Sequence, residues 1–164
     1  MSLALIPGSF DPMTVGHLDI VKRTLSLYDE VVVAVLVNPD KHYDHTLEER
    51  TEMAELTVAG LERVRVVSSE GMLVDLFDRL GADVIVKGIR NDRDRAYEEK
   101  MAEANLALNP RATTIFLQAA DDYESVNSTR VRQLVHAGES PDQLVVPAVV
   151  EYLRARGELD TDKR

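Results

Sequence analysis

Short apolar runs alternate with amphipathic segments along most of the chain. Five runs rich in β-branched residues are typical of parallel strands covered on both faces, and they span Leu3–Ile6, Val31–Val37, Val64–Val67, Val84–Lys87 and Thr114–Leu117. The amphipathic segments between them predict helices over Gly16–Tyr28, Leu47–Ala59, Leu73–Leu80 and Asp94–Leu108. This alternation predicts an α/β fold with a Rossmann-like, doubly wound sheet of five parallel strands and helices on both faces.

Local signals mark where several of these helices begin and end. Thr46 and Glu49 have the spacing of a capping box at the start of the second helix, and Gly81 marks the end of the third. Two further helices are expected over Ser128–His136 and Pro147–Arg156.

The length of 164 residues suits one domain with a real hydrophobic core. We expect that domain to span residues 1–157 and a polar, mobile tail to span residues 158–164. The absence of cysteine excludes disulfides, thiol nucleophiles and thiolate metal sites. Without a membrane-spanning apolar run or a signal-peptide pattern, the protein is expected to be soluble and cytoplasmic, with no membrane partner.

The formal net charge of −10 argues against non-specific binding to nucleic acid or to an anionic membrane. The chain has no tryptophan and only three phenylalanines, which also disfavours a broad platform for base stacking. Any phosphate site must therefore be a local concentration of basic groups on a negative background.

The most unusual stretch, I-P-G-S-F-D-P-M-T-V-G-H at Ile6–His17, follows the first predicted strand. Gly8 would let the backbone approach a ligand, Thr14 is placed to cap the next helix, and Gly16 leaves a helix face without a side chain. His17 would project from the first helical turn, where free N–H groups and the helix dipole favour an anion. The alternative interpretation is a simple strand–helix corner with an exposed histidine.

Other loops are expected at the same edge, because ligands of such sheets bind at the carboxyl ends of the strands. The second strand leads to Asn38–Lys41, the fourth to Lys87–Arg90, and the fifth to Asp121–Arg130. Each loop offers cations or helix-capping side chains, so together they predict a phosphate-binding edge.

These motifs carry a resemblance to known enzymes. The segment G-S-F-D-P-x-T-x-G-H resembles the T/H-x-G-H phosphate site of the nucleotidyltransferase superfamily. With the N-P-x-K loop, T-L-E-E-R at Thr46–Arg50 and K-G-I-R at Lys87–Arg90, the chain resembles the phosphopantetheine adenylyltransferase family from about Leu3 to Val135. The resemblance implies an enzyme that makes dephospho-coenzyme A and pyrophosphate from ATP and 4′-phosphopantetheine, in coenzyme A biosynthesis.

The same resemblance implies roles for individual residues. His17 would bind the ATP phosphates and stabilise the transition state as the catalytic residue, while Ser9 and Phe10 would contact both substrates. The acceptor site would be completed by Lys41, Leu73 and Lys87. The remaining ATP contacts would come from Gly88, Ile89, Arg90, Glu98, Tyr123, Glu124, Ser125, Val126, Asn127, Ser128 and Thr129.

An acceptor phosphate is already a nucleophile, so this chemistry needs no protein base or covalent intermediate. Mg²⁺ is expected to arrive with ATP on substrate oxygens, and no protein-held metal site is expected. The resemblance also implies a hexamer and coenzyme A as a product-like inhibitor. Apolar side chains that are candidates for subunit contacts, or alternatively for covering the sheet edge, are Leu144, Val145, Val146, Val149 and Val150.

Two segments depart from the family pattern. The family often has D-F-E-Y-E where this chain has D-R-A-Y-E at Asp94–Glu98, and the loop Tyr123–Thr129 has Glu and Asn at an aromatic and a serine position. Arg132 is a candidate for a basic residue one turn into the following helix.

Two alternative functions stay open from the residues alone. One is another small-molecule nucleotidyltransferase, of the nicotinamide-nucleotide adenylyltransferase or cytidylyltransferase type, although those usually have His at the position of Thr14. The other is a non-catalytic nucleotide-sensing module. The three remaining histidines, His42, His45 and His136, are interpreted as surface residues.

Overall fold

The computed structural model describes residues 1–159, and residues 160–164 lie outside the described part. The strands are β1 (Leu3–Gly8), β2 (Glu30–Leu36), β3 (Val64–Ser69), β4 (Val84–Ile89) and β5 (Thr114–Gln118). The helices are α1 (Val15–Leu25), α2 (Leu47–Val58), α3 (Leu73–Leu80), α4 (Asp92–Leu108), α5 (Ser128–His136) and α6 (Pro147–Ala155), with a 3₁₀ turn at Asp121–Tyr123. The sequence therefore predicted every one of these strands and α-helices, with differences of a few residues at their ends.

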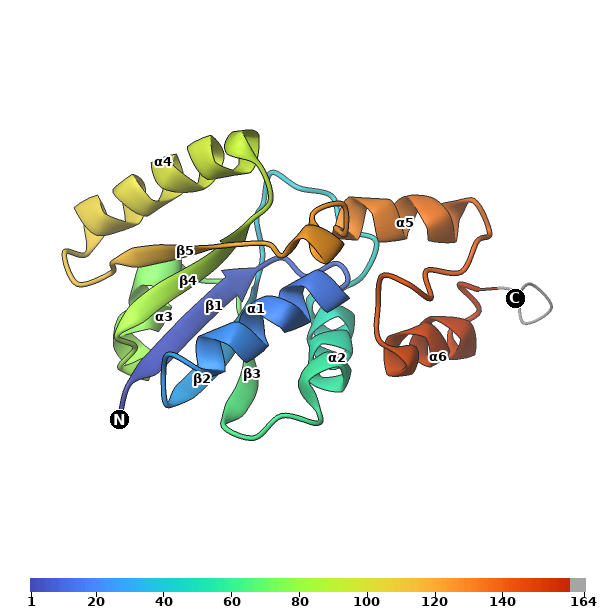
Figure 1. Ribbon diagram of the computed structural model, residues 1–164, viewed down its shortest axis with the longest axis horizontal. Coiled ribbons are helices and arrows are strands. Elements are labelled where there is room, and N and C mark those ends of the chain that lie inside the picture. Colours follow the sequence, from blue (N-terminus) through green and yellow to red (C-terminus); the bar gives the residue numbers. More distant parts are fainter. Residues whose placement is uncertain (160–164) are drawn as a thin grey trace.

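The five strands form one parallel sheet in the order β3-β2-β1-β4-β5 (Figure 1). The chain builds outward from β1 to β3 and then returns to the other side of β1 with β4. The strand order thus reverses between β1 and β4. The loops that follow these two strands run in opposite directions from that point, which is where ligands of such sheets bind. The predicted doubly wound fold is confirmed.

Alternate residues of each central strand enter two different cores, because successive strand side chains point to opposite faces. Ile6 packs in the core that α1 and α2 cover, whereas Leu5 packs in the core that α3 covers. Val33 and Val32 of β2 divide in the same way. Burial on both faces explains why the strands read as continuous apolar runs.

Helix α4 lies on the surface of the molecule along its whole length. It contacts β4 and α3, yet none of its residues is buried. Tyr97, Met101 and Leu108 are 56%, 43% and 61% exposed. Apolar side chains on the open face of a long helix form a candidate contact surface.

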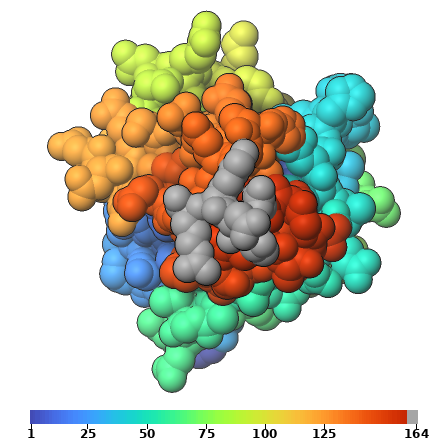
Figure 2. Space-filling view, turned by 90° about the vertical axis from the view of Figure 1, so that its right-hand side faces the viewer, coloured from blue at the N-terminus to red at the C-terminus, as the bar shows by residue number. Residues whose placement is uncertain are grey.

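The orange and red C-terminal helices cover one end of the molecule (Figure 2), and their apolar side chains form a third core. Val145, Val149 and Val150 are buried there beside Met53 of α2 and Val131 of α5. The expectation that these valines make subunit contacts is therefore wrong, because they are used inside the chain. They also do not cover the sheet edge, since their neighbours are helices.

The expected mobile tail is wrong for its first two residues. Leu159 is 5% exposed in the third core, and the Glu158 carboxylate accepts a hydrogen bond from His45. The rest of that predicted tail lies outside the described residues. Within residues 1–159, no helix combines the length and the apolar character needed to cross a membrane.

Candidate active site

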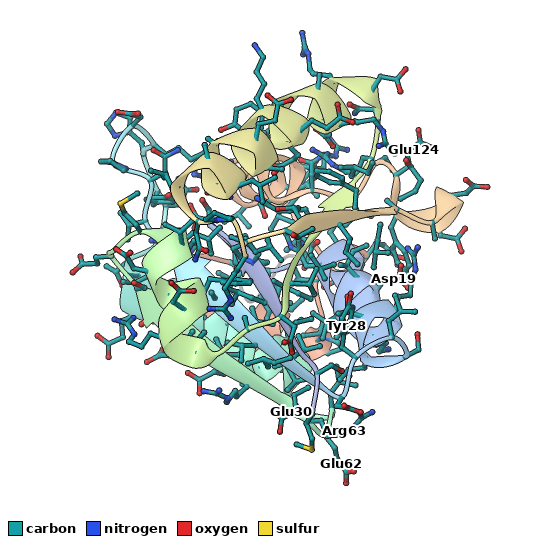
Figure 3. The ribbon with its side chains drawn as sticks, turned by 90° about the vertical axis from the view of Figure 1, so that its left-hand side faces the viewer. Asp19, Tyr28, Glu30, Glu62, Arg63 and Glu124 are labelled. Atoms are coloured by element: carbon teal, nitrogen blue, oxygen red, sulfur yellow. The ribbon has the colours of Figure 1, made fainter. Side chains whose placement is uncertain are left out.

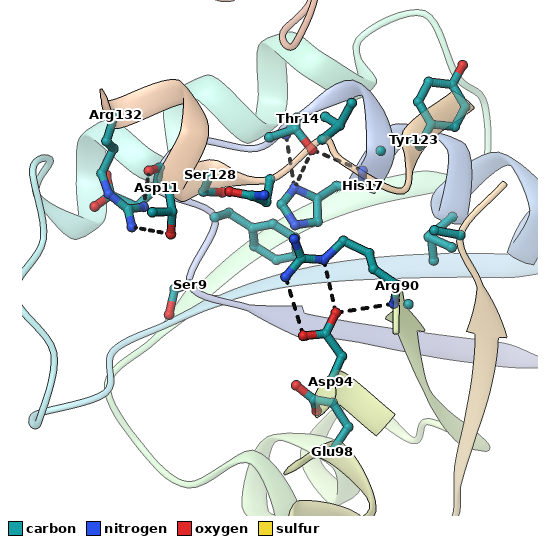
Figure 4. Close-up of a pocket in the computed structure, with 18 of the residues that line it drawn as sticks. Ser9, Asp11, Thr14, His17, Arg90, Asp94, Glu98, Tyr123, Ser128 and Arg132 are labelled. Carbon is teal, nitrogen blue, oxygen red and sulfur yellow. Dashed lines mark hydrogen bonds and ion pairs between the residues drawn. The ribbon is translucent and has the colours of Figure 1, made fainter. Parts of the chain in front are cut away.

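A cavity of about 510 Å³ opens where the strand order reverses (Figure 4). The turn after β1, the loop after β2, the end of β4, the start of α4 and the segment from β5 into α5 all contribute to its wall. Its size lies in the range of small-molecule sites. The edge predicted from the loops is thus one continuous pocket.

The first wall of the cavity is the N-terminus of α1. Thr14 is the N-cap residue, and its hydroxyl accepts a hydrogen bond from the backbone N–H of His17 at 3.3 Å. In return, the backbone N–H of Thr14 donates to Nδ1 of His17 at 2.9 Å. This is a capping box in which a histidine ring takes the usual place of Glu or Gln.

The capping box fixes the protonation of the His17 ring. Because Nδ1 accepts a backbone hydrogen bond, the neutral ring must carry its proton on Nε2. Burial, Arg90 and Lys87 lower the pKa of His17 to about 4. At neutral pH, His17 is therefore an uncharged hydrogen-bond donor among cations.

Phe10 supports the same ring from the side. Its ring meets that of His17 edge to face, with centroids 5.0 Å apart and an interplanar angle of 83°. Phe10 adopts a left-handed backbone with φ 49°, which is costly for a side chain of this size and recurs at functional sites. A Cβ at Gly8 would lie 2.9 Å from the Phe10 ring, so the glycine makes room for Phe10.

Two ion pairs border the cavity below His17. Arg90 Nε lies 3.0 Å from Asp94 Oδ2, and Figure 4 shows the guanidinium between His17 and Asp94. Lys87 Nζ lies 2.9 Å from Glu98 Oε2. These carboxylates hold the cations in place, and the cations keep His17 from binding a proton.

The loop after β2 is tied to the turn after β1. Tyr43 and Ser9 share a hydrogen bond between their hydroxyls at 3.1 Å. The Arg50 guanidinium, only 1% exposed, lies 3.9 Å from the centre of the Tyr43 ring and donates to the carbonyl of Ser9 at 2.7 Å. Lys41, in the same loop as Tyr43, also lines the cavity.

The N-terminus of α5 forms another wall. Asn127 caps the helix by accepting from the N–H of Arg130, and the Ser128 hydroxyl donates to the carbonyl of Pro12 at 2.7 Å. Arg132 donates to the carbonyl of Asp11 at 2.8 Å. Several N–H groups of these first turns are already engaged, since Val15 donates to the carbonyl of Leu144, His17 to the Thr14 hydroxyl and Arg130 to Asn127. The positive ends of the two helix dipoles still meet at one cavity, which favours an anion there.

The structure brings most of the predicted site residues together. Those that line the cavity are Ser9, Phe10, His17, Lys41, Gly88, Arg90, Glu98, Tyr123, Val126, Asn127, Ser128 and Thr129. Lys87 is joined to the lining through Glu98. Gly88 has a packing role as well, because a Cβ there would lie 2.9 Å from Ile20 of α1.

Besides Lys87, four predicted residues do not line the cavity. Ile89 is 1% exposed in the interior, and Leu73 packs against the core beneath α3. Glu124 and Ser125 are exposed, and Figure 3 shows Glu124 at the outer edge of the molecule. Their predicted contacts stay predictions, since they concern the substrate-bound protein.

Several lining residues were not predicted, among them Asp11, Tyr43 and Asp94. Asp11 stands inside the G-S-F-D-P motif, which could have pointed to it. Tyr43 gave no signal, because its partners are fixed only by folding. Arg132, a candidate from the sequence, does line the cavity.

The interpretation of the remaining histidines needs one correction. His136 pairs with Asp44 with its side chain 67% exposed, and His42 is exposed, so both are surface residues. His45 is not, because it is 6% exposed and lies between Asp11 and Glu158.

Carboxylates at the cavity are engaged with cations of the chain. Within residues 1–159, no cluster of three or more His, Cys, Asp or Glu side chains has the arrangement of a metal site.

Comparisons with known proteins agree with this picture. Residues 5–134 match the family model described as cytidylyltransferase-like. The phosphopantetheine adenylyltransferase of Symbiobacterium thermophilum is 42% identical over 156 residues, covering 95% of this chain and 96% of that protein. The enzyme of the same name from Limosilactobacillus reuteri strain DSM 20016 is 38% identical over 156 residues, covering 95% and 90%.

A solved structure from Vibrio parahaemolyticus, assigned as a nicotinate-nucleotide adenylyltransferase, superposes with a TM-score of 0.71 over 96% of this chain and 95% of that one. The identity is 20%, so this likeness speaks for the fold alone.

Proposed function

Because the chain belongs to the phosphopantetheine adenylyltransferase family, within the cytidylyltransferase-like group, we propose that it transfers the adenylyl group of ATP to 4′-phosphopantetheine. The products are dephospho-coenzyme A and pyrophosphate. The observation that carries the mechanism is the His17 ring, held as an uncharged donor beside two helix N-termini.

In this reaction an oxygen of the acceptor phosphate forms a bond to the α-phosphorus of ATP. The bond from that phosphorus to the oxygen bridging the β-phosphate breaks, and pyrophosphate leaves with the electron pair. No proton has to move, so no general base is required. The protein must hold two polyanions in line and stabilise the five-coordinate transition state.

His17 fits this requirement through Nε2–H. Charge builds on the non-bridging oxygens of the α-phosphate as the transition state forms, and a fixed donor at that place acts most strongly there. A neutral ring costs little to hold among Arg90 and Lys87, whereas an imidazolium would be repelled.

The cations divide the two substrates between them. Lys41, with Ser9 and Lys87, is proposed to hold the acceptor phosphate, and Leu73 to contact the same substrate. Arg90 and the N-terminus of α5 are proposed to hold the phosphates of ATP, since a guanidinium and backbone N–H groups both suit phosphate oxygens.

We propose that Mg²⁺ enters with ATP, bound to phosphate oxygens, where it would neutralise charge on the leaving pyrophosphate. Asp94 and Glu98 lie at the cavity but are engaged by Arg90 and Lys87. Their part in this proposal is to orient those cations rather than to hold the metal.

The proposed function is tested by pyrophosphate release from ATP with three acceptors: 4′-phosphopantetheine, nicotinamide mononucleotide and glycerol 3-phosphate. Release with the first alone, and formation of ATP from dephospho-coenzyme A and pyrophosphate, is the expected result. Turnover of either other acceptor without 4′-phosphopantetheine would overturn the substrate assignment. ATP binding without any turnover would favour the nucleotide-sensing module.

Assembly, inhibition and location are part of the same proposal. We propose a cytoplasmic hexamer that coenzyme A inhibits as a product-like ligand. The exposed Tyr97, Met101 and Leu108 of α4 supply an apolar surface for subunit contacts, in place of the buried valines before and within α6. Sedimentation at working concentration tests the assembly, and a monomer would contradict it.

A further inference from the structure

A row of three ionisable side chains, two of them buried and the third, Glu158, with its side chain 26% exposed, lies beside the cavity but outside the proposed chemistry. His45 Nδ1 lies 2.8 Å from Asp11 Oδ1, and His45 Nε2 lies 2.6 Å from Glu158 Oε1. Asp11 is 2% exposed and His45 6%. The row joins the turn after β1, the loop before α2 and the segment after α6.

Hydrogen-bond chemistry determines the charge of His45 in this arrangement. Ionised carboxylates only accept, so each ring nitrogen needs a hydrogen to donate. A neutral ring has one N–H and would turn a lone pair toward the other carboxylate. The geometry is therefore that of an imidazolium between two carboxylates.

The surrounding charges allow this state. Burial alone would lower the pKa of His45, but the hydrogen bonds to Asp11 and Glu158 outweigh it and leave the pKa raised. Burial likewise raises the pKa of Asp11, yet its bonds from His45 and from the N–H of Asp44 leave it lowered. The charged groups that face this row from the neighbouring elements are Arg50 and Glu49 of α2, Asp44, Arg132 and His136 of α5, and Arg156.

Asp11 is the member of the row that reaches the site. It lines the cavity, and it is held by the N–H of Asp44 at one oxygen, by His45 at the other and by Arg132 at its carbonyl. Ser9 and Phe10 directly precede it, so a shift of Asp11 would move the residues that support His17.

We infer that His45, held by Glu158 from the C-terminal segment, is a positioning residue that fixes Asp11 and thereby the phosphate-binding turn from Ser9 to Thr14. The C-terminal segment thus belongs to the active-site architecture without touching the cavity. This inference rests on the proposed adenylyl transfer for its kinetic readout, while its structural part stands on the contacts alone.

The test compares His45→Gln and Glu158→Gln with the wild type, and Glu151→Gln serves as a matched control because Glu151 pairs with Arg154 on the exposed face of α6. Misplacement of a reacting group by about 1 Å can cost up to 100-fold in rate. We expect His45→Gln to lower kcat by about tenfold at pH 7, with KM for ATP changed by less than about threefold.

The pH profile separates positioning from simple stabilisation. In the wild type, kcat should fall as the pH rises through the raised pKa of His45. Glu158→Gln removes one stabilising carboxylate, so this fall should begin at lower pH, and His45→Gln should lack it. Glu151→Gln should keep the wild-type profile.

Unchanged kcat and an unchanged alkaline limb in folded Glu158→Gln and His45→Gln proteins would overturn the inference, even if both variants melt earlier. If His45→Gln does not fold, the pH at which kcat of Glu158→Gln falls decides the question. If the wild type transfers no adenylyl group, the proposed function fails by itself. The row is then tested by the free energy of unfolding, which should fall as the pH rises through the His45 pKa and should do so at lower pH in Glu158→Gln.

Discussion

His17 and His45 contact different residues of one turn and have different charge states. His17 accepts a backbone hydrogen bond at Nδ1. Burial of the ring, with Arg90 and Lys87 nearby, lowers its pKa to about 4. His45 donates toward Asp11 and Glu158, and its pKa is raised. The same side chain is thus a neutral donor at the cavity and a cation in the wall behind it.

The difference follows from what each region has to bind. The cavity region concentrates cations in an acidic chain, and a neutral histidine adds a donor there without adding repulsion. The region around His45 joins three chain segments, which are the turn after β1, the loop before α2 and the segment after α6. An imidazolium suits this place because it can donate to two carboxylates at once. The following variants change residues at the cavity, where His17 is neutral.

The largest effect is expected for His17→Ala. Loss of Nε2–H removes a donor needed mainly in the transition state, so kcat should fall by roughly 100-fold or more, about 2.7 kcal/mol. ATP binding should weaken much less, because the helix N-termini remain. His136→Ala, at an exposed ion pair, is the control. Near-normal kcat in a folded His17→Ala protein would mean that the ring serves only the helix end.

A smaller effect is expected for Lys41→Ala. Lys41 makes no ion pair with the residues that the structure describes, whereas Lys87 is paired with Glu98, so Lys41 is the cation more available to a ligand. The KM for 4′-phosphopantetheine should rise about tenfold while ATP affinity stays near that of the wild type. Exposed Lys22→Ala on α1 is the control. Loss of ATP affinity with normal acceptor binding would mean that Lys41 belongs to the ATP half of the site instead.

The smallest effect is expected for Thr14→Val, compared with Thr46→Val. Both threonines cap helices through capping boxes, but only Thr14 caps at the cavity. Loss of either hydroxyl should cost about 1 kcal/mol, or roughly 2–4 °C in Tm. Only Thr14→Val should also lower kcat by a few fold, because His17 loses part of its support. Equal kcat in the two variants would mean that the Thr14 cap stabilises the helix without supporting catalysis.

The fold and the cavity lining were largely predictable because their signals are local. Apolar runs gave the strands, Thr46 with Glu49 gave a helix start, and the loops at the strand ends gave the edge where ligands bind. Parallel strands bring such loops together wherever they stand in the sequence. The individual site residues were predicted from the resemblance to a family, and the parallel sheet explains why most of them meet.

His45 was missed because its partners are distant. Asp11 is 34 residues away and Glu158 is 113, and no periodic pattern connects them. The apolar residues before and within α6 were misread for a similar reason. Val145 and Val149 pack on Met53, a contact that only the folded chain creates. The local sequence pattern shows whether a side chain is apolar or titratable. Tertiary contacts decide which residues bury it and, for a titratable group, whether it is charged.

The most direct test is a nitrogen NMR titration of the histidine rings between about pH 5 and 8. The chain has four histidines, so His17→Ala and His45→Gln assign the two signals of interest. At about pH 5.5, where an ordinary histidine is mostly charged, His17 should be neutral with its proton on Nε2. At about pH 7, where an ordinary histidine is mostly neutral, His45 should carry protons on both nitrogens. Ordinary titration of both rings near pH 6.5 would contradict the account.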